Sequence, residues 1–184
     1  FVYIVIVNRE QNHFWVNQYN ANSGDFIKTL FEEQDEKYAE PLVPIMFVKN
    51  NPNQFIWQSK RDGWNHLYLF KFVKGRPIIK QITKGPWEVT EGLGFTKDGK
   101  YGLYENTMAS PLERHVHALD WANSKVDATG MKIKAIDLTP FIGTNKCSFE
   151  TKNGILLNIH SSYSTPRIIY MIDVEKSILN YHIN

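Results

Sequence analysis

The sequence predicts an all-β protein built from short antiparallel strands in a repeating unit. Three observations indicate this class: turn-forming residue pairs recur, strand-like runs flank each pair, and segments with helical periodicity are scarce. The unit recurs at roughly fifty residues, the spacing of the four-stranded blades of a β-propeller. The sequence therefore favours part of a propeller over an ordinary β-sandwich, which uses similar strands and turns.

The turn pairs each follow a run that contains an aromatic residue. The pairs are Asn50-Asn51, Asp98-Gly99 and Asn153-Gly154, and the aromatics are Phe47, Phe95 and Phe149. An Asx side chain closes its own backbone turn, and a following glycine accepts a positive φ. Two predicted strands follow each turn, at 54–58 and 64–70, at 101–105 and 115–119, and at 155–160 and 168–172. Residues 1–7, 14–19 and 26–31 are predicted as strands of an earlier unit.

The strand at 64–70 is apolar on both faces. One face carries Trp64, His66, Tyr68 and Phe70, and the other carries Asn65 and the leucines 67 and 69. A half-exposed strand would alternate apolar with polar residues, whereas a blade packed between two others needs two apolar faces. We therefore expect Trp64 to be buried against a neighbouring blade, aimed by a tight turn at Arg61-Asp62-Gly63.

One short helix is predicted, at residues 32–38, where acidic residues suit a solvated connection between blades. Composition excludes other classes. The formal charge is +2 with 21 dispersed basic residues, so we expect no nucleic-acid partner, and no apolar run is long enough to cross a membrane. Residues 1–7 read as a strand without an initiating Met, so we expect the chain to begin inside a longer protein. The lone Cys147 excludes an internal disulfide framework.

Four histidines lie on predicted strands and are candidate metal ligands: His66, His115, His117 and His160. His115 and His117 share a strand face, but nothing supplies a third ligand at metal-site spacing. We expect no metal and no cofactor.

Glu88 and Glu91 are candidates for a catalytic acid and base, because paired carboxylates across a bond hydrolyse glycosides in some propellers. A carboxylate at a strand start more often caps a turn or pairs with arginine, and Arg61 or Arg114 is available, so we favour a structural role. No serine has a local base or a glycine-flanked elbow, and no catalytic residue is assigned.

Specific motifs mark a resemblance to a known family. They are Tyr38-Ala39-Glu40-Pro41, residues 54–70, the segment 82–91 with Trp87-Glu88-Val89-Thr90-Glu91, Ser110-Pro111-Leu112-Glu113-Arg114, and Asn8-Arg9-Glu10-Gln11-Asn12. In this order the chain resembles the non-catalytic propeller domain of the dipeptidyl-peptidase IV group, in the prolyl oligopeptidase family of serine peptidases. The resemblance covers nearly the whole chain, residues 1–184, and is most specific in the central segments.

The resemblance implies an eight-bladed propeller, of which this chain supplies three to four blades. It also implies a hydrolase domain on the same polypeptide, release of Xaa-Pro or Xaa-Ala dipeptides from peptide substrates, and a periplasmic or secreted location. The Gly-x-Ser-x-Gly elbow of the hydrolase domain is absent from this sequence. Open blade faces in such a fragment are expected to self-associate.

The resemblance also implies site residues. The segment with Tyr38 and Glu40 faces the substrate cavity in that family, so both are expected to bind substrate. The family's ammonium-binding acidic pair is not transferred to Glu32-Glu33, because its setting differs; the true pair is expected upstream of Phe1. Structural roles are expected for Gly63, Trp64, Trp87, Glu88 and Arg114.

Three hypotheses therefore stand. The leading one is a propeller portion that gates and positions peptides for a downstream hydrolase domain. The second is a stand-alone interaction module that binds peptide or protein. The third is a propeller glycosidase using Glu88 and Glu91.

Overall fold

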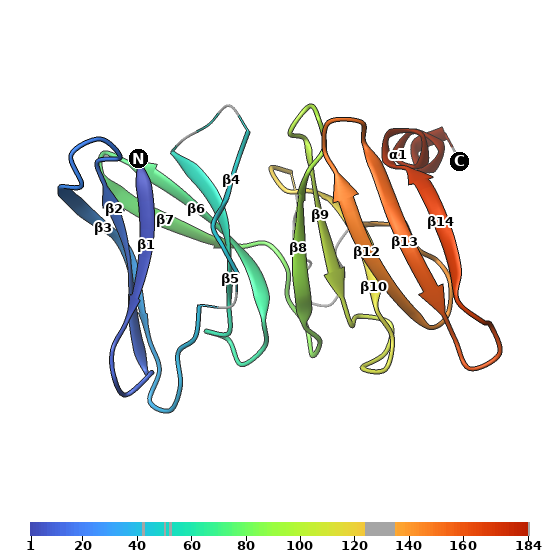
Figure 1. Ribbon diagram of the computed structural model, residues 1–184, viewed down its shortest axis with the longest axis horizontal. Coiled ribbons are helices and arrows are strands. Elements are labelled where there is room, and N and C mark those ends of the chain that lie inside the picture. Colours follow the sequence, from blue (N-terminus) through green and yellow to red (C-terminus); the bar gives the residue numbers. More distant parts are fainter. Residues whose placement is uncertain (42, 50, 52, 124–134, 184) are drawn as a thin grey trace.

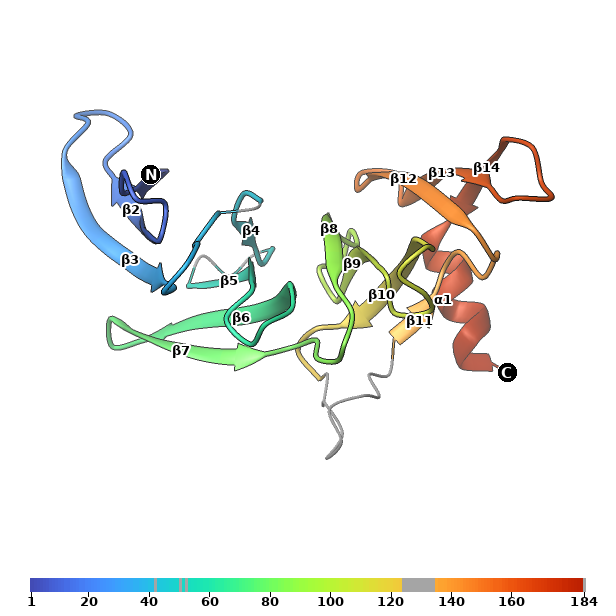
Figure 2. The ribbon, with the colours of Figure 1, turned by 90° about the horizontal axis from the view of Figure 1, so that it is seen from below.

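The computed structural model describes residues 1–41, 43–49, 51, 53–123 and 135–183. These residues form four antiparallel sheets, which follow one another in chain order from left to right in Figure 1. In the perpendicular view the sheets fan out in a curved row (Figure 2). We call them blades 1 to 4.

Each blade is an antiparallel meander of strands that are consecutive in sequence. Blade 1 contains β1 (Val2–Val7), β2 (His13–Tyr19) and β3 (Phe26–Gln34), and blade 2 contains β4 (Met46–Phe47), β5 (Gln54–Ser59), β6 (His66–Val73) and β7 (Arg76–Gln81). Blade 3 contains β8 (Val89–Phe95), β9 (Tyr101–Asn106), β10 (His115–Asp120) and β11 (Ala135–Asp137). Blade 4 contains β12 (Thr144–Glu150), β13 (Ile155–Ser161) and β14 (Ile168–Asp173), followed by helix α1 (Val174–Ile183). The all-β propeller portion predicted from sequence is confirmed.

Two of the predicted turn pairs are formed where the sequence places them. Gly99 has φ +74° and its amide donates to the Thr96 carbonyl at 2.8 Å; Gly154 has φ +69° and its amide donates to the Glu150 carbonyl at 3.0 Å. A left-handed backbone at these positions suits glycine. The third pair includes Asn50, which lies outside the described residues.

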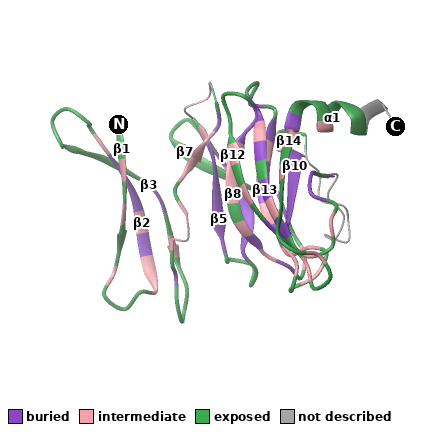
Figure 3. Ribbon diagram, turned by 45° about the vertical axis from the view of Figure 1, so that its right-hand side comes forward, coloured by how far each residue is buried: buried purple, intermediate pink, exposed green. Residues whose placement is uncertain are grey.

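Three hydrophobic cores lie between successive blades. The core between blades 1 and 2 contains Phe14, Val16, Leu30, Phe31, Ala39, Phe55, Trp57, Tyr68 and Phe70. The core between blades 2 and 3 contains Val48, Ile56, Leu67, Ile82, Trp87, Val89, Phe95, Tyr104 and Leu119. The core between blade 3 and blade 4 with α1 contains Tyr101, Leu103, Val116, Ala118, Ile136, Leu138, Leu156, Val174 and Ile178. Figure 3 shows buried segments on the strands between neighbouring blades, whereas much of blade 1 is exposed.

Strand β6 shows why a blade needs two apolar faces. Tyr68 and Phe70 enter the core with blade 1, while Leu67 and Leu69 pack in the core with blade 3. Burying one such side chain stabilises the fold by about 1.5–3 kcal/mol before ordering entropy is subtracted. The sequence prediction for these residues is confirmed.

The helix predicted at 32–38 is wrong. Strand β3 continues to Gln34, because Glu32 and Glu33 pair with Trp15 and Phe14 of β2. The helix that forms, α1, was not predicted. Asp173 caps it by accepting the Lys176 amide at 3.0 Å, and this bond is the main reason that the Asp173 pKa is lowered. None of the described helical residues builds a segment long and apolar enough to cross a membrane.

The outer faces of blades 1 and 4 carry exposed apolar side chains. Val2, Ile4 and Ile6 of β1 are 45, 45 and 43% exposed, while Tyr3 and Val5 between them pack toward blade 2. On β14, Ile169 is 61% and Met171 is 75% exposed. In the middle of the chain the corresponding faces are covered by the next blade.

Candidate functional site

A pocket of about 270 Å³, lined mainly by residues with charged side chains, lies between blades 1 and 2. It is lined by Glu32, Glu33, Gln34, Asp35, Tyr38, Ala39, Glu40, Lys60 and Arg61. The end of β3, the connection to blade 2 and the β5–β6 turn supply these residues. The pocket therefore brings together Tyr38 and Glu40, the two residues for which a substrate-binding role is expected.

A charged cluster fixes one wall of the pocket. The Arg61 guanidinium forms an ion pair with Glu33. Ser59 Oγ donates to the same carboxylate at 2.8 Å and accepts the Arg61 Nε–H at 3.0 Å. The guanidinium also lies over the Tyr68 ring, 4.8 Å from its centroid. A carboxylate held by a cation and a hydroxyl is rigid, so Glu33 joins blade 1 to blade 2 at this point.

The connection after β3 is held in place by side-chain and backbone bonds. Asp35 Oδ1 accepts the Lys37 and Tyr38 amides at 2.8 and 3.2 Å, and these two bonds lower the pKa of Asp35. The Ala39 amide donates to the Gln11 carbonyl at 2.9 Å. The connection is thereby anchored to the β1–β2 loop, and Tyr38 and Glu40 are presented from a fixed backbone.

The β1–β2 loop is in turn ordered by Asn8. Its Oδ1 accepts the Asn12 and His13 amides, each at 3.0 Å, and its Nδ2 donates to Asn12 Oδ1 at 2.7 Å. The motif at residues 8–12, which contributed to the family resemblance, thus orders the loop to which the Ala39 amide is bonded.

Charge in the pocket is predominantly negative, because four carboxylates face two cations. Glu33 is occupied by Arg61, and Glu32 lies 3.1 Å from His13 Nε2. Glu40 is exposed, and no ion pair or hydrogen bond of its carboxylate occurs within the described parts of the chain. Such a pocket suits N–H donors and cationic groups.

An apolar hollow of about 490 Å³ adjoins this connection. Tyr3, Val5, Pro41, Val43, Pro44, Ile45 and Phe47 line it. Segment 38–41 therefore separates an acidic pocket from an apolar one.

The burial expected for Trp64 is wrong. Trp64 is 42% exposed. Gly63 nevertheless forms the expected turn: its φ is +95°, and its amide donates a hydrogen bond of 2.8 Å to the Lys60 carbonyl. Strand β6 begins at His66, two residues later than expected, and His66 is fully buried. Trp64 therefore lies in the loop before β6, and His66 is the first residue of the strand.

Trp87 is buried and packs edge-on against His66, with ring centroids 4.8 Å apart. A Cβ on Gly85 would collide with the Trp87 indole, and Gly85 has φ +142°, so this position requires glycine. Glu88 acts through its backbone: its amide donates to Thr107 Oγ1 at 3.0 Å, and its carbonyl accepts the Thr107 amide at 2.9 Å.

Arg114 does not form the ion pair with Glu88 that was considered. Its guanidinium donates to the carbonyls of Pro111 and Glu113 at 3.0 and 2.8 Å. Its backbone bridges to Thr144, the first residue of blade 4, in a parallel β-bridge. Arg61 pairs with Glu33 instead of Glu88.

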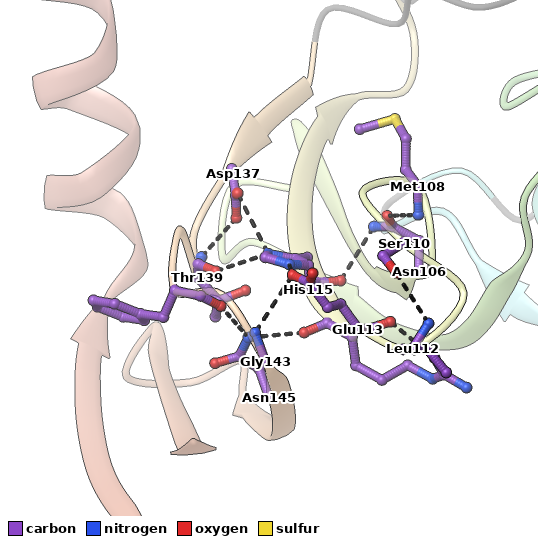
Figure 4. A network of polar contacts seen from close by, with 12 residues as sticks. Asn106, Met108, Ser110, Leu112, Glu113, His115, Asp137, Thr139, Gly143 and Asn145 are labelled. Atoms are coloured by element: carbon purple, nitrogen blue, oxygen red, sulfur yellow. Dashed lines mark hydrogen bonds and ion pairs between the residues drawn. The ribbon is translucent and has the colours of Figure 1, made fainter. Parts of the chain in front are cut away.

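The histidines considered as metal ligands have protein partners (Figure 4 shows those of His115). His66 contacts Thr83 and Gly85, His117 contacts Asn106, and His160 contacts Asn145. Across the residues that the structure describes, no cluster of three His, Cys, Asp or Glu suits a metal ion.

Sequence reasoning missed Glu33, Ser59 and Arg61 as pocket residues. The sequence marks Glu33 only as half of the Glu32-Glu33 pair, to which the ammonium-binding role is not transferred, and Arg61 only as a turn residue and a possible partner of Glu88. No local signal joins them, because Glu33 and Arg61 come from different blades.

Comparison with known proteins gives a consistent result. The family described as the dipeptidyl peptidase IV (DPP IV) N-terminal region matches residues 1–167. The chain is similar to a probable dipeptidyl peptidase 4 of Aspergillus fumigatus, with 28% identity over 173 residues, covering 78% of this chain and 22% of that protein. A shorter match to a probable dipeptidyl peptidase 4 of Aspergillus clavatus has 41% identity over 63 residues, covering 34% of this chain and 8% of that protein. The chain thus spans about a fifth of the first relative's length.

Solved structures show the same similarity. The crystal structure of Porphyromonas gingivalis dipeptidyl peptidase 4 superposes with a TM-score of 0.75 at 25% identity, over 95% of this chain and 23% of that one. A Bacteroides ovatus protein described as a dipeptidyl aminopeptidase IV gives a TM-score of 0.76 at 31% identity, over 94% of this chain and 26% of that one.

Proposed function

Because the chain belongs to the dipeptidyl peptidase IV N-terminal region family, we propose that it forms part of a propeller wall that positions peptides for cleavage. The reaction itself is assigned to a hydrolase domain elsewhere on a longer polypeptide, since this sequence has no nucleophile elbow. The activity of that polypeptide is release of N-terminal Xaa-Pro or Xaa-Ala dipeptides, in a periplasmic or secreted setting.

The acidic pocket between blades 1 and 2 carries this proposal. Its Glu33–Arg61–Ser59 cluster is rigid, and its Tyr38–Glu40 segment is anchored by Asp35 and the β1–β2 loop. A rigid concave surface binds at a lower entropy cost than a flexible one. The pocket therefore suits a segment of peptide beyond the cleaved dipeptide.

The charge of the pocket suggests which peptides it favours. Glu40 is the carboxylate with the fewest protein partners, and its position before Pro41 restricts its backbone. Peptides with a basic side chain near this point gain a charge-assisted contact, whereas acidic side chains are repelled. Pro41 and the adjoining apolar hollow accept apolar neighbours.

Replacing Glu40 by alanine in the longer enzyme tests the proposal. We expect KM for tetrapeptides to rise several-fold, because a contact present in both ground and transition states is removed. The kcat for a dipeptide chromogenic substrate is expected to stay unchanged, since that substrate does not reach the pocket. Glu36→Ala is the matched control, because Glu36 is an exposed acid of the same connection that does not line the pocket.

Equal kinetics for wild type and Glu40→Ala on both substrate lengths would reject the pocket as a peptide subsite. A fall in kcat for the dipeptide chromogen, shared by Glu36→Ala, would indicate instead a general distortion of the connection.

The exposed outer faces of blades 1 and 4 support a role in association. Val2, Ile4 and Ile6 on one face and Ile169 and Met171 on the other are apolar surface that other blades bury. The isolated chain is proposed to self-associate through these faces, as a stand-alone interaction module also would. Sedimentation at tens of micromolar should show dimers or larger species, which Ile4→Lys together with Met171→Lys should reduce. A clean wild-type monomer is the contrary result.

A further inference from the structure

The hairpin formed by β6 and β7 concentrates positive charge. Five basic residues and no acidic residue lie between Trp64 and Trp87, and all five basic residues are exposed: Lys71, Lys74, Arg76, Lys80 and Lys84. The remainder of the chain has 16 basic and 19 acidic residues, a net charge of −3. The net charge of +2 therefore arises from this one segment.

Strand pairing places two of these cations beside exposed aliphatic side chains. Lys71 lies opposite Ile78, and Arg76 lies opposite Val73. Directly opposed residues share a face of an antiparallel pair, and so do residues two apart along a strand, so all four side chains lie on one face. Val73 is 41% and Ile78 is 55% exposed. This face of the hairpin therefore intersperses cations with apolar groups.

The turn adds a further cation. Lys74 and Gly75 connect the two strands, with φ +51° and +80°. Positive φ at both central positions is the mark of a type I′ turn, in which asparagine or aspartate normally precedes the glycine. A lysine at the first position is uncommon and places its ammonium at the end of the hairpin. We call residues 71–78 the hairpin tip.

The base of the hairpin is held between blades, so the tip is presented on a fixed support. Phe70 is buried in the core with blade 1, and Leu69 packs in the core with blade 3. The Phe72 amide donates to the Asn53 carbonyl at 3.0 Å, and Lys28 of blade 1 places its ammonium 5.2 Å from the Phe72 ring centroid. In Figure 2 the hairpin runs away from blade 3, with its turn at the far end.

The cations of the tip are not neutralised within the chain. The ion pairs between described residues do not include Lys71, Lys74 or Arg76. Asp62 lies in the turn before β6, and it accepts a hydrogen bond from Gln81, at the end of β7 remote from the tip. The tip therefore presents unpaired positive charge to an external partner.

We propose that the hairpin tip binds the surface of a bilayer that contains anionic lipids. The cations meet the lipid phosphates, and the lysine stems, Val73 and Ile78 enter the boundary between headgroups and acyl chains. Both kinds of side chain are used only at such an interface, because a polyanion in water would bind the cations and leave the aliphatic groups exposed. The contact is peripheral, and no strand or helix crosses the bilayer.

Sedimentation of the chain with phosphatidylcholine vesicles tests the charge requirement. Binding is expected when about a third of the lipid is phosphatidylglycerol, and it should weaken with added salt and be lost on neutral vesicles. Lys74→Glu together with Arg76→Glu should lower the partition coefficient by at least about twentyfold, since each cation contributes about fivefold near an anionic leaflet. The matched control is Lys146→Glu with Lys152→Glu, the same charge change at two exposed residues of blade 4.

The control pair should change the partition coefficient far less than the hairpin pair, with unchanged circular dichroism in both. A wild-type chain that stays in the supernatant with anionic vesicles contradicts the proposal. Equal losses in the two pairs contradict it too, because net charge and not the hairpin would then govern binding.

The aliphatic contact separates a bilayer from a soluble polyanion. Val73→Ser with Ile78→Ser keeps the charge and should weaken vesicle binding several-fold, while Ile169→Ser, at an exposed apolar residue of blade 4, should not. Binding of inorganic polyphosphate should be unaffected by the serine pair. Vesicle binding that is also unaffected by the serine pair would identify the tip as a polyanion site and overturn the assignment to a bilayer.

Discussion

Blades 2 and 3 place the same kind of side chain at the same point and give it different partners. His66 begins β6 and His115 begins β10. In each blade a threonine hydroxyl accepts the amide of the next residue: Leu67 N–H to Thr83 at 2.9 Å, and Val116 N–H to Thr139 at 2.8 Å. Blades 2 and 3 therefore share the same backbone arrangement here, including this threonine hydrogen bond.

The difference lies at Nδ1. His66 Nδ1 lies 3.1 Å from the Thr83 hydroxyl, which can donate its proton, and Nε2 lies 3.0 Å from the Gly85 carbonyl. A neutral ring satisfies both contacts, and burial is the main cause of the lowered pKa of His66. His115 meets a carbonyl and a carboxylate instead. The repeat therefore sets where the ring lies, and the partner atoms set which hydrogen bonds the ring makes.

The largest expected effect tests whether the two blades are equivalent in their cores. Trp57 of β5 and Tyr104 of β9 are both 1% exposed, and each pairs across its blade with the third strand. Replacement by alanine should lower the free energy of unfolding by about 3–5 kcal/mol at either site. Trp64→Ala, at an exposed indole, should cost less than about 1 kcal/mol.

Denaturant titration of the three variants measures these differences. If Trp64→Ala were as destabilising as Trp57→Ala, the loop position of Trp64 would be wrong. If Tyr104→Ala were mild, blade 3 would not repeat the packing of blade 2.

A smaller effect separates the two threonines. Thr83→Val and Thr139→Val each leave a buried amide without its acceptor, which should cost about 1–3 kcal/mol. Thr83→Val should cost more, because His66 Nδ1 also loses its donor, whereas His115 bonds the Thr139 backbone. The NMR chemical shifts of the histidine ring nitrogens sharpen the comparison. The ring shifts of His66 should change in Thr83→Val, whereas those of His115 should stay the same in Thr139→Val. Equal ring shifts in both variants would remove the distinction between the blades.

The strands were predictable because their signals are local. Turn pairs at Gly99 and Gly154 and apolar runs such as β6 identify elements without knowledge of their neighbours. Strand β7 gave no such signal, since five of its six residues are exposed. The helix predicted at 32–38 failed because pairing of Glu32 and Glu33 with β2 outweighed their helix propensity.

The site was predictable only in part. Tyr38 and Glu40 came from the family resemblance and lie together in the pocket. The Glu33–Arg61 ion pair was not predictable, because it joins residues of two blades whose relative position depends on packing. Trp64 was assigned to the core because its place in the alternation matched that of Tyr68 and Phe70, and the later start of β6 moved it into the loop.

Reversal of charge at Glu40 tests the proposed peptide-positioning role most directly. In the longer enzyme, kcat/KM would be compared for two tetrapeptides that share the cleaved dipeptide and carry either Lys or Glu beyond it. Wild type is predicted to favour the Lys peptide, and Glu40→Lys is predicted to reverse that preference while cleaving a dipeptide chromogen at the wild-type rate. An unchanged preference in Glu40→Lys would show that the pocket between blades 1 and 2 does not contact the peptide.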